Sequence, residues 1–231
     1  VCTKATPPRQ FQPGFVQPRK IRRANAGALT VASWAAKEHL IAVIARAPWT
    51  IAKTAVAAVV FSVFMESFSM PVGPSELHFV GAMAMYLTLG FLPTLLGFAL
   101  GLALQGLLFS PWDMVHLGVN SLSLMLPLIA LHYSVGRKLF DQSVGTRLSM
   151  AKIVKLDAIY YAGVTSMVGF WLWIGNAETA FADWAAFASA YLIVVALEPV
   201  LTWGVVNGLK KVQDNKVVQN LFVVHELNTT R

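Results

Sequence analysis

The feature that most constrains this chain is a run of thirty-one consecutive residues without a charge, residues 79–109. A helix needs about 20 apolar residues to cross the hydrocarbon layer of a membrane, so this run is too long for one span. Gly90 and Pro93 lie near its middle, and both residue types tend to interrupt helices. The run therefore predicts a hairpin of two membrane helices, broken between Leu89 and Thr94. Because turns at membrane depth are tolerated only inside protein, we expect it at the centre of a bundle.

The composition agrees with a membrane protein. Hydrophobic residues make up 56% of the 231 residues and charged residues only 13%, whereas soluble domains carry about 25% charged residues. We therefore expect an all-α, polytopic helical membrane protein. The net charge of +7 comes largely from basic residues that flank apolar segments, which indicates orientation in a membrane and lipid contact, not nucleic-acid binding. The single cysteine, Cys2, predicts no disulfide.

Three parts can be distinguished along the chain. We expect an extended, basic, proline-rich arm over residues 1–23, a transmembrane helical domain over 24–209 and a polar tail over 210–231. The first twenty residues show no apolar core of a secretory signal. Residues 24–46 predict either a tilted span or an interfacial helix. The other expected spans are 47–65, the two helices of 79–109, 117–136, 158–177 and 182–208.

Charge predicts the orientation of these spans. Basic residues concentrate in loop 137–157 and at Lys210 and Lys211, which places both segments in the cytoplasm. Loops 65–78, 110–116 and 178–183 are then external, so residues 79–109 must cross the membrane an even number of times or dip in and return. The basic cluster at residues 19–23 favours the cytoplasm, but a crossing by 24–46 would place it outside, and the sequence leaves both possibilities open.

Few residues could carry chemistry. No two of the five histidines are three or four residues apart, and no metalloprotease, Walker A or nucleophile-elbow motif occurs. His78 could bind a metal, since neutral imidazole is a common metal ligand, or it could be a loop residue bonded to backbone. Glu198 lies inside the last span before Pro199, where a carboxylate is a functional candidate. Alternatively it is a neutralised or interface-facing carboxyl at a kink.

Other polar and small residues in the spans favour packing. Gln105 predicts an interhelical hydrogen bond, and Asn120 is expected to hold helices together. Gly97 and Gly101 form a GxxxG pair that allows close helix approach. We expect these glycines and Gly163 to suit lateral contact with other membrane proteins.

Two segments resemble a known family. PVGPSELHFVGA, 71–82, and LGLALQGLLFSPWDMVHLGVNSLSLMLPLIAL, 100–131, are similar to the membrane subunit of cobalt and nickel energy-coupling-factor transporters, the CbiM/NikM type. The resemblance covers about residues 9–210. It implies a multi-pass permease of the bacterial inner membrane that captures Co²⁺ or Ni²⁺ at its external face. It also implies two kinds of partner, a membrane coupling protein and cytoplasmic ATPases.

The resemblance also implies where the metal binds. The family's ligands are the free amino terminus, the next backbone amide, a second-position histidine and a loop histidine, whose place His78 takes. In the segment that matches the family's start, Arg9–Gly14, Gln10 stands where the histidine should be, and eight residues precede Arg9. The resemblance therefore implies a degenerate site near Gln10, Pro13 and His78 at the external membrane surface. We expect no bound cofactor, and Ni or Co only if the inherited site still functions.

Two functions follow as alternatives. The first is a metal-uptake subunit with lost or altered metal binding. The second is a non-transporting accessory or structural subunit of a larger membrane complex, with the arm as its attachment. A membrane enzyme would have only His78 and Glu198 to support it, and we expect no enzymatic activity.

Overall fold

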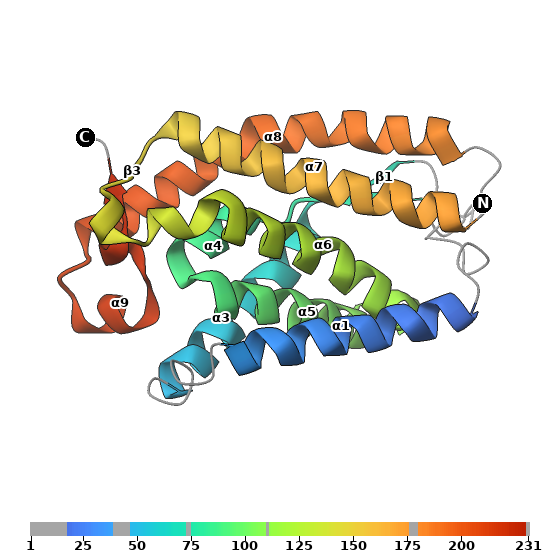
Figure 1. Ribbon diagram of the computed structural model, residues 1–231, viewed down its shortest axis with the longest axis horizontal. Coiled ribbons are helices and arrows are strands. Elements are labelled where there is room, and N and C mark those ends of the chain that lie inside the picture. Colours follow the sequence, from blue (N-terminus) through green and yellow to red (C-terminus); the bar gives the residue numbers. More distant parts are fainter. Residues whose placement is uncertain (1–17, 39–46, 73–74, 110, 176–179, 230–231) are drawn as a thin grey trace, which may run out of the picture.

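Long helices running roughly parallel to the longest axis form most of the molecule (Figure 1). The computed structural model describes residues 18–38, 47–72, 75–109, 111–175 and 180–229. The α-helices are α1 (Pro18–Glu38), α3 (Ala47–Ser67), α4 (Ala82–Leu89), α5 (Phe91–Leu108), α6 (Leu117–Leu131), α7 (Met150–Ile174), α8 (Ala180–Lys211) and α9 (Lys216–Leu221). The strands are β1 (Ser69–Val72), β2 (Ser75–His78), β3 (Arg147–Leu148) and β4 (Asn228–Thr229), and the short helical turns are η1 (Pro111–His116), η2 (His132–Gly136), η3 (Arg137–Leu139), η4 (Gln142–Val144) and η5 (Val224–Glu226).

Four helical segments of the described chain are long and apolar enough to cross a membrane. They are Pro48–Ser67, Phe91–Leu108, Met114–Leu139 and Phe181–Lys211. Helix α7 is not among them. The prediction of an all-α, multi-pass membrane protein is confirmed.

The broken hairpin is also confirmed, and Gly90 makes the break between α4 and α5. Its φ of 93° lies in a region that favours glycine, and its N–H donates to the carbonyl of Tyr86 at 3.1 Å. Pro93 lies in the first turn of α5, where a missing N–H costs little. With eight residues, α4 is about 12 Å long and cannot cross a membrane alone.

The segment before α4 supplies the rest of that crossing. Residues 65–78 were expected to form a loop, but β1 and β2 pair antiparallel, with Ser69 opposite His78 and Met70 opposite Leu77. Both strands pack along α8. The amide of Val223 in the C-terminal tail donates to the carbonyl of Thr88 at 2.7 Å, so α4 ends beside that tail. The strand pair and α4 together run through the bundle toward the predicted cytoplasmic end, and α5 runs back toward the predicted external end.

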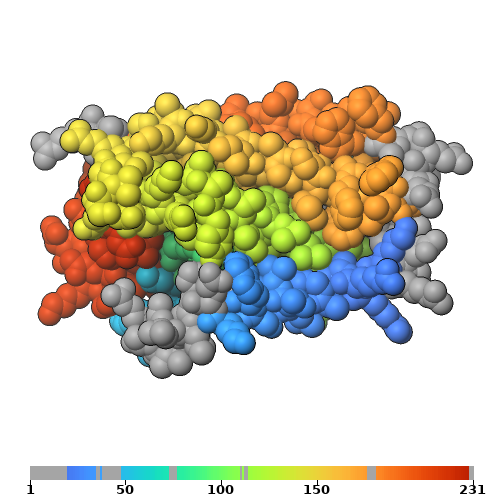
Figure 2. All heavy atoms as spheres, in the orientation of Figure 1, coloured from blue at the N-terminus to red at the C-terminus, as the bar shows by residue number. Residues whose placement is uncertain are grey.

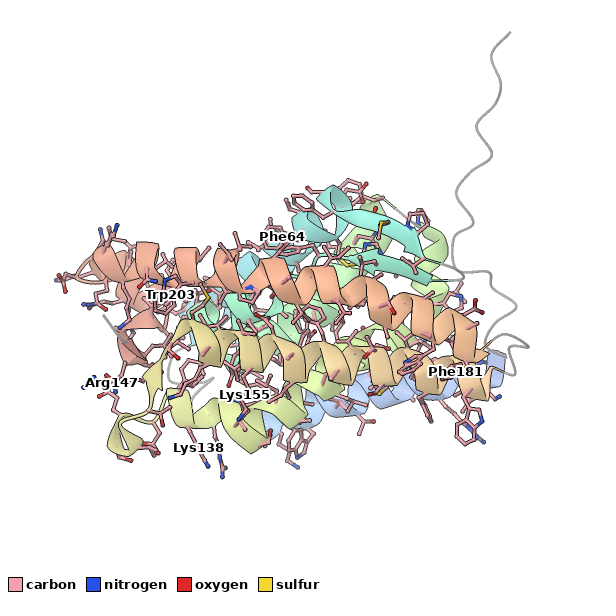
Figure 3. The ribbon with its side chains drawn as sticks, turned by 90° about the horizontal axis from the view of Figure 1, so that it is seen from above. Phe64, Lys138, Arg147, Lys155, Phe181 and Trp203 are labelled. Carbon is pink, nitrogen blue, oxygen red and sulfur yellow. The ribbon has the colours of Figure 1, made fainter. Side chains whose placement is uncertain are left out.

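The loops lie at the two ends of the molecule in the grouping that the charge pattern predicted. The ammonium group of Lys20 donates to the carbonyl of Ile174, so α1 begins where α7 ends. The Asn25 side chain accepts the amide of Gly118 at 2.8 Å, which brings α6 to the same end. Figure 3 shows Lys138, Arg147 and Lys155 toward the opposite end from Phe181.

Helix α1 carries the basic cluster, whose side of the membrane the sequence left open. It runs along α6 (Figure 2), and its buried face carries Ile21, Ala24 and Ala28. It begins at the end predicted to be external, with Arg22 and Arg23 exposed. Burial of this face against α6 therefore holds the basic cluster at the same end of the bundle as the end of α7.

At the predicted cytoplasmic end, the C-terminal segment folds against the bundle. Residues expected to form a polar tail include α9 and β4, and β4 pairs in parallel with β3 through Arg147 and Asn228. The Lys210 side chain donates to the carbonyl of Leu227. Helix α7 starts at Met150, capped by Ser149, so the loop predicted at 137–157 is shorter than expected.

The small residues expected to contact other proteins are used inside the chain. A Cβ atom added at Gly97 would lie 2.4 Å from that of Ala57, and one at Gly101 would lie 2.6 Å from the Phe61 ring. Helices α3 and α5 therefore approach closely at these positions. Gly163 packs in the same way on Pro127 of α6. The GxxxG packing is confirmed, but as an internal contact.

Candidate functional site

His78 ends β2, opposite Ser69, and is half-buried. Its Nδ1 lies 3.2 Å from the carbonyl oxygen of Met65. A carbonyl oxygen only accepts hydrogen bonds, so in the neutral imidazole Nδ1 carries the proton and Nε2 the lone pair. Metal-binding histidines commonly use this arrangement, in which one ring N–H is fixed by a backbone carbonyl. His78 is therefore oriented as a metal ligand would be.

The depth of His78 follows from its neighbour on α8. The main chain of His78 forms a hydrogen bond with Tyr191, which is 5% exposed. Tyr191 lies eleven residues after the first residue of α8, or about 16 Å along the helix axis. His78 thus lies in the half of the molecule predicted to be external, well below the end of α8. The neighbours expected for it, Gln10 and Pro13, lie outside the described residues.

Glu198 lies deeper along the same helix and is 0% exposed. One carboxylate oxygen accepts the backbone N–H of Met83 at 3.0 Å, and the other accepts the hydroxyl of Tyr161. The amides of Gly81 and Ala82 also face this carboxylate. These amides belong to the first turn of α4, where unpaired N–H groups and the helix dipole favour a negative charge.

Through these hydrogen bonds Glu198 fixes the eight-residue helix α4 inside the bundle. The prediction that Glu198 might face the lipid interface is wrong, because its side chain is enclosed by α4, α7 and α8. Its two direct partners were not predicted. Backbone amides carry no sequence signature, and a lone tyrosine in an apolar span gives little sign of its role. The signal that could have found them is the intramembrane carboxylate itself, which requires donors.

Two further polar candidates, Gln105 and His116, are also buried. Gln105 and His116 are 6% and 3% exposed, on α5 and at the end of η1. Within the part of the chain that the structure describes, no group of three or more histidine, cysteine, aspartate or glutamate residues could hold a metal ion. The metal-binding role of His78 therefore stays a prediction.

Comparisons with known proteins agree with this architecture. The family model described as the cobalt uptake substrate-specific transmembrane region, CbiM, matches residues 11–215. A crystal structure of a transition metal transporter superposes with a TM-score of 0.66 at 19% identity, covering 90% of this chain and 96% of that one. No curated protein matches by sequence. The similarity in structure shows a shared fold, and the family match covers most of the chain. The chain therefore belongs to the CbiM family, the substrate-specific transmembrane region of cobalt uptake.

Proposed function

We propose that this chain is the membrane-embedded, substrate-facing component of a Co²⁺ or Ni²⁺ uptake system in a bacterial inner membrane. The family match over residues 11–215 carries the proposal. It is supported by the orientation of His78, whose Nδ1 is held by the Met65 carbonyl so that Nε2 has the lone pair for a metal. The proposed partners are a membrane coupling protein and cytoplasmic ATPases.

We propose further that metal capture is weakened. Gln10 replaces the histidine that the family uses, and an amide is a poor ligand for borderline-soft divalent metals compared with imidazole. Loss of an outer-shell partner alone costs about 10–100-fold in metal affinity, and loss of direct ligands costs more. The purified chain should then retain much less than one Co or Ni per molecule after dialysis, by elemental analysis.

The test of transport is metal accumulation by cells that express the chain together with its coupling protein and ATPases. His78→Ala should lower Co²⁺ or Ni²⁺ accumulation, because it removes the remaining imidazole ligand. His225→Ala is the matched control, since His225 belongs to η5 in the C-terminal tail, at the opposite end of the bundle. Equal accumulation in wild type and His78→Ala would contradict a transport role for this site.

The alternative function, an accessory subunit that transports nothing, is favoured by the same replacement at Gln10. Native purification in mild detergent followed by mass spectrometry distinguishes the two. A coupling protein with ATPases supports transport, and a different membrane complex supports the accessory role. Deleting residues 1–17 leaves α1 complete. Loss of the partner on deletion, with metal accumulation unchanged, would leave only the accessory role.

A further inference from the structure

A second buried carboxyl lies one helical turn from the Glu198 anchor. Helices α7 and α8 are antiparallel neighbours, joined where Tyr161 donates to Glu198. Residues four apart share one face of a helix. One turn toward the predicted cytoplasmic end, this register places Asp157 of α7 level with Thr202 of α8. Both residues are 0% exposed.

Asp157 differs from Glu198 in its partners. Neither of its carboxyl oxygens, nor the hydroxyl of Thr202, has a hydrogen-bond partner among the described residues. Buried polar atoms are nearly always paired, and an ionised carboxylate without a partner is far costlier than a neutral acid. A fully buried carboxyl whose two oxygens have no described donor is therefore more stable as the neutral acid.

The charges around Asp157 also favour its neutral form. Glu198 is the carboxylate that faces it, and two buried like charges at short range oppose each other's ionisation. Glu198 has the amides of α4 and the Tyr161 hydroxyl to stabilise its charge, whereas Asp157 has no described donor.

No described cation balances Asp157. The titratable side chains on the elements packed against it are the tyrosines Tyr86, Tyr160, Tyr161 and Tyr191, together with His132, Lys152, Lys155, Lys210 and Lys211. His132 is paired with the Tyr86 hydroxyl at 2.9 Å. Lys152 donates to the Arg147 carbonyl and Lys210 to that of Leu227, while Lys155 and Lys211 are exposed.

We propose that Asp157 is a proton-binding site inside the membrane-spanning bundle, where it holds one proton at neutral pH while Glu198 remains ionised. The proton is the ligand of the site, and the neighbouring Glu198 charge keeps it there. The inference is independent of metal transport, since it rests on the α7–α8 interface and not on His78.

Infrared spectroscopy of the full chain in lipid nanodiscs tests it. At neutral pH the protein should show a carboxylic acid C=O band that shifts in D₂O. Asp157→Asn should remove this band, and Asp141→Asn, at an exposed loop position, should leave it.

Isotope labelling removes any dependence on folding of the variants. In wild-type protein the band should shift with ¹³C in the aspartate carboxyl and stay unchanged with ¹³C in the glutamate carboxyl. A band that follows the glutamate label would overturn the assignment to Asp157. Absence of an aspartic acid band, with a carboxylate band lost in Asp157→Asn, would also overturn it, since Asp157 would then be ionised and paired with a bound cation.

Discussion

Replacing Tyr161 by phenylalanine should destabilise the bundle through the anchor of α4. The substitution removes only the hydroxyl that donates to Glu198, and the ring remains in place, 1% exposed. Glu198 then keeps the Met83 amide at 3.0 Å as its direct donor. One oxygen of a fully buried carboxylate loses its partner and cannot be compensated by water.

The charge of Glu198 decides the size of this effect. Hydrogen bonds between helices in a membrane protein average about 0.6 kcal/mol, because the unfolded chain in the membrane also finds partners. A hydrogen bond to a charged group contributes about 1.5–3 kcal/mol. Because the amides at the start of α4 favour the ionised carboxylate, we expect the larger range. This corresponds to roughly a tenfold to hundredfold increase in the unfolding equilibrium constant.

The adjacent residue provides a matched control. Tyr160 is also fully buried, and its hydroxyl has no partner among the described residues. Tyr160→Phe should therefore change the free energy of unfolding by no more than about 0.5 kcal/mol. Titration with a denaturing detergent, followed by tryptophan fluorescence, measures both variants. If the two variants lose the same stability, or Tyr161→Phe costs only about 0.6 kcal/mol, Glu198 is not an ionised anchor.

Two further predictions concern packing and pH. Gly97→Ala should lower the free energy of unfolding by about 1–3 kcal/mol, because its Cβ would lie 2.4 Å from Ala57, whereas Gly204→Ala meets no atom within 4 Å and should be neutral. Hydrogen bonds from Ser143 lower the pKa of Asp141. Its stabilising contribution is therefore present above the unfolded pKa and lost as the pH falls below about 4, and Asp141→Asn should flatten this acid dependence of the unfolding midpoint.

Much of the fold follows from the sequence because the relevant signals are local. The charge-free length of 79–109 and its central Gly90 identified the hairpin, and basic residues grouped the loops by end. The strand pair was missed because Pro71 and the short, polar segments around it resemble a loop. The strand pair packs along α8, and this contact with a distant helix cannot be read from residues 65–78.

The side of the basic cluster could not be predicted because two rules of similar strength opposed each other. The positive-inside preference acts on Arg22 and Arg23, while the apolar face of α1 favours a crossing. The structure shows that Ile21 and Ala24 are buried against the bundle, so this face packs along α6 and the basic residues lie at the end where α7 ends. A hydropathy window cannot weigh a contact with a helix almost a hundred residues away.

The parts of the site that sequence reasoning found and missed differ in one physical respect. His78 could be proposed as a metal ligand because an imidazole is visible in the sequence as a residue type at a position that matches the family. The α4 anchor was missed because its donors are backbone amides, left without helical partners where α4 begins after its N-cap Gly81, which has a φ of 66°. Almost any residue can supply a backbone amide, whereas an imidazole comes only from histidine. A chain can therefore retain this architecture while the side chains of its proposed metal site change, which is why family membership determines the fold here more firmly than the activity.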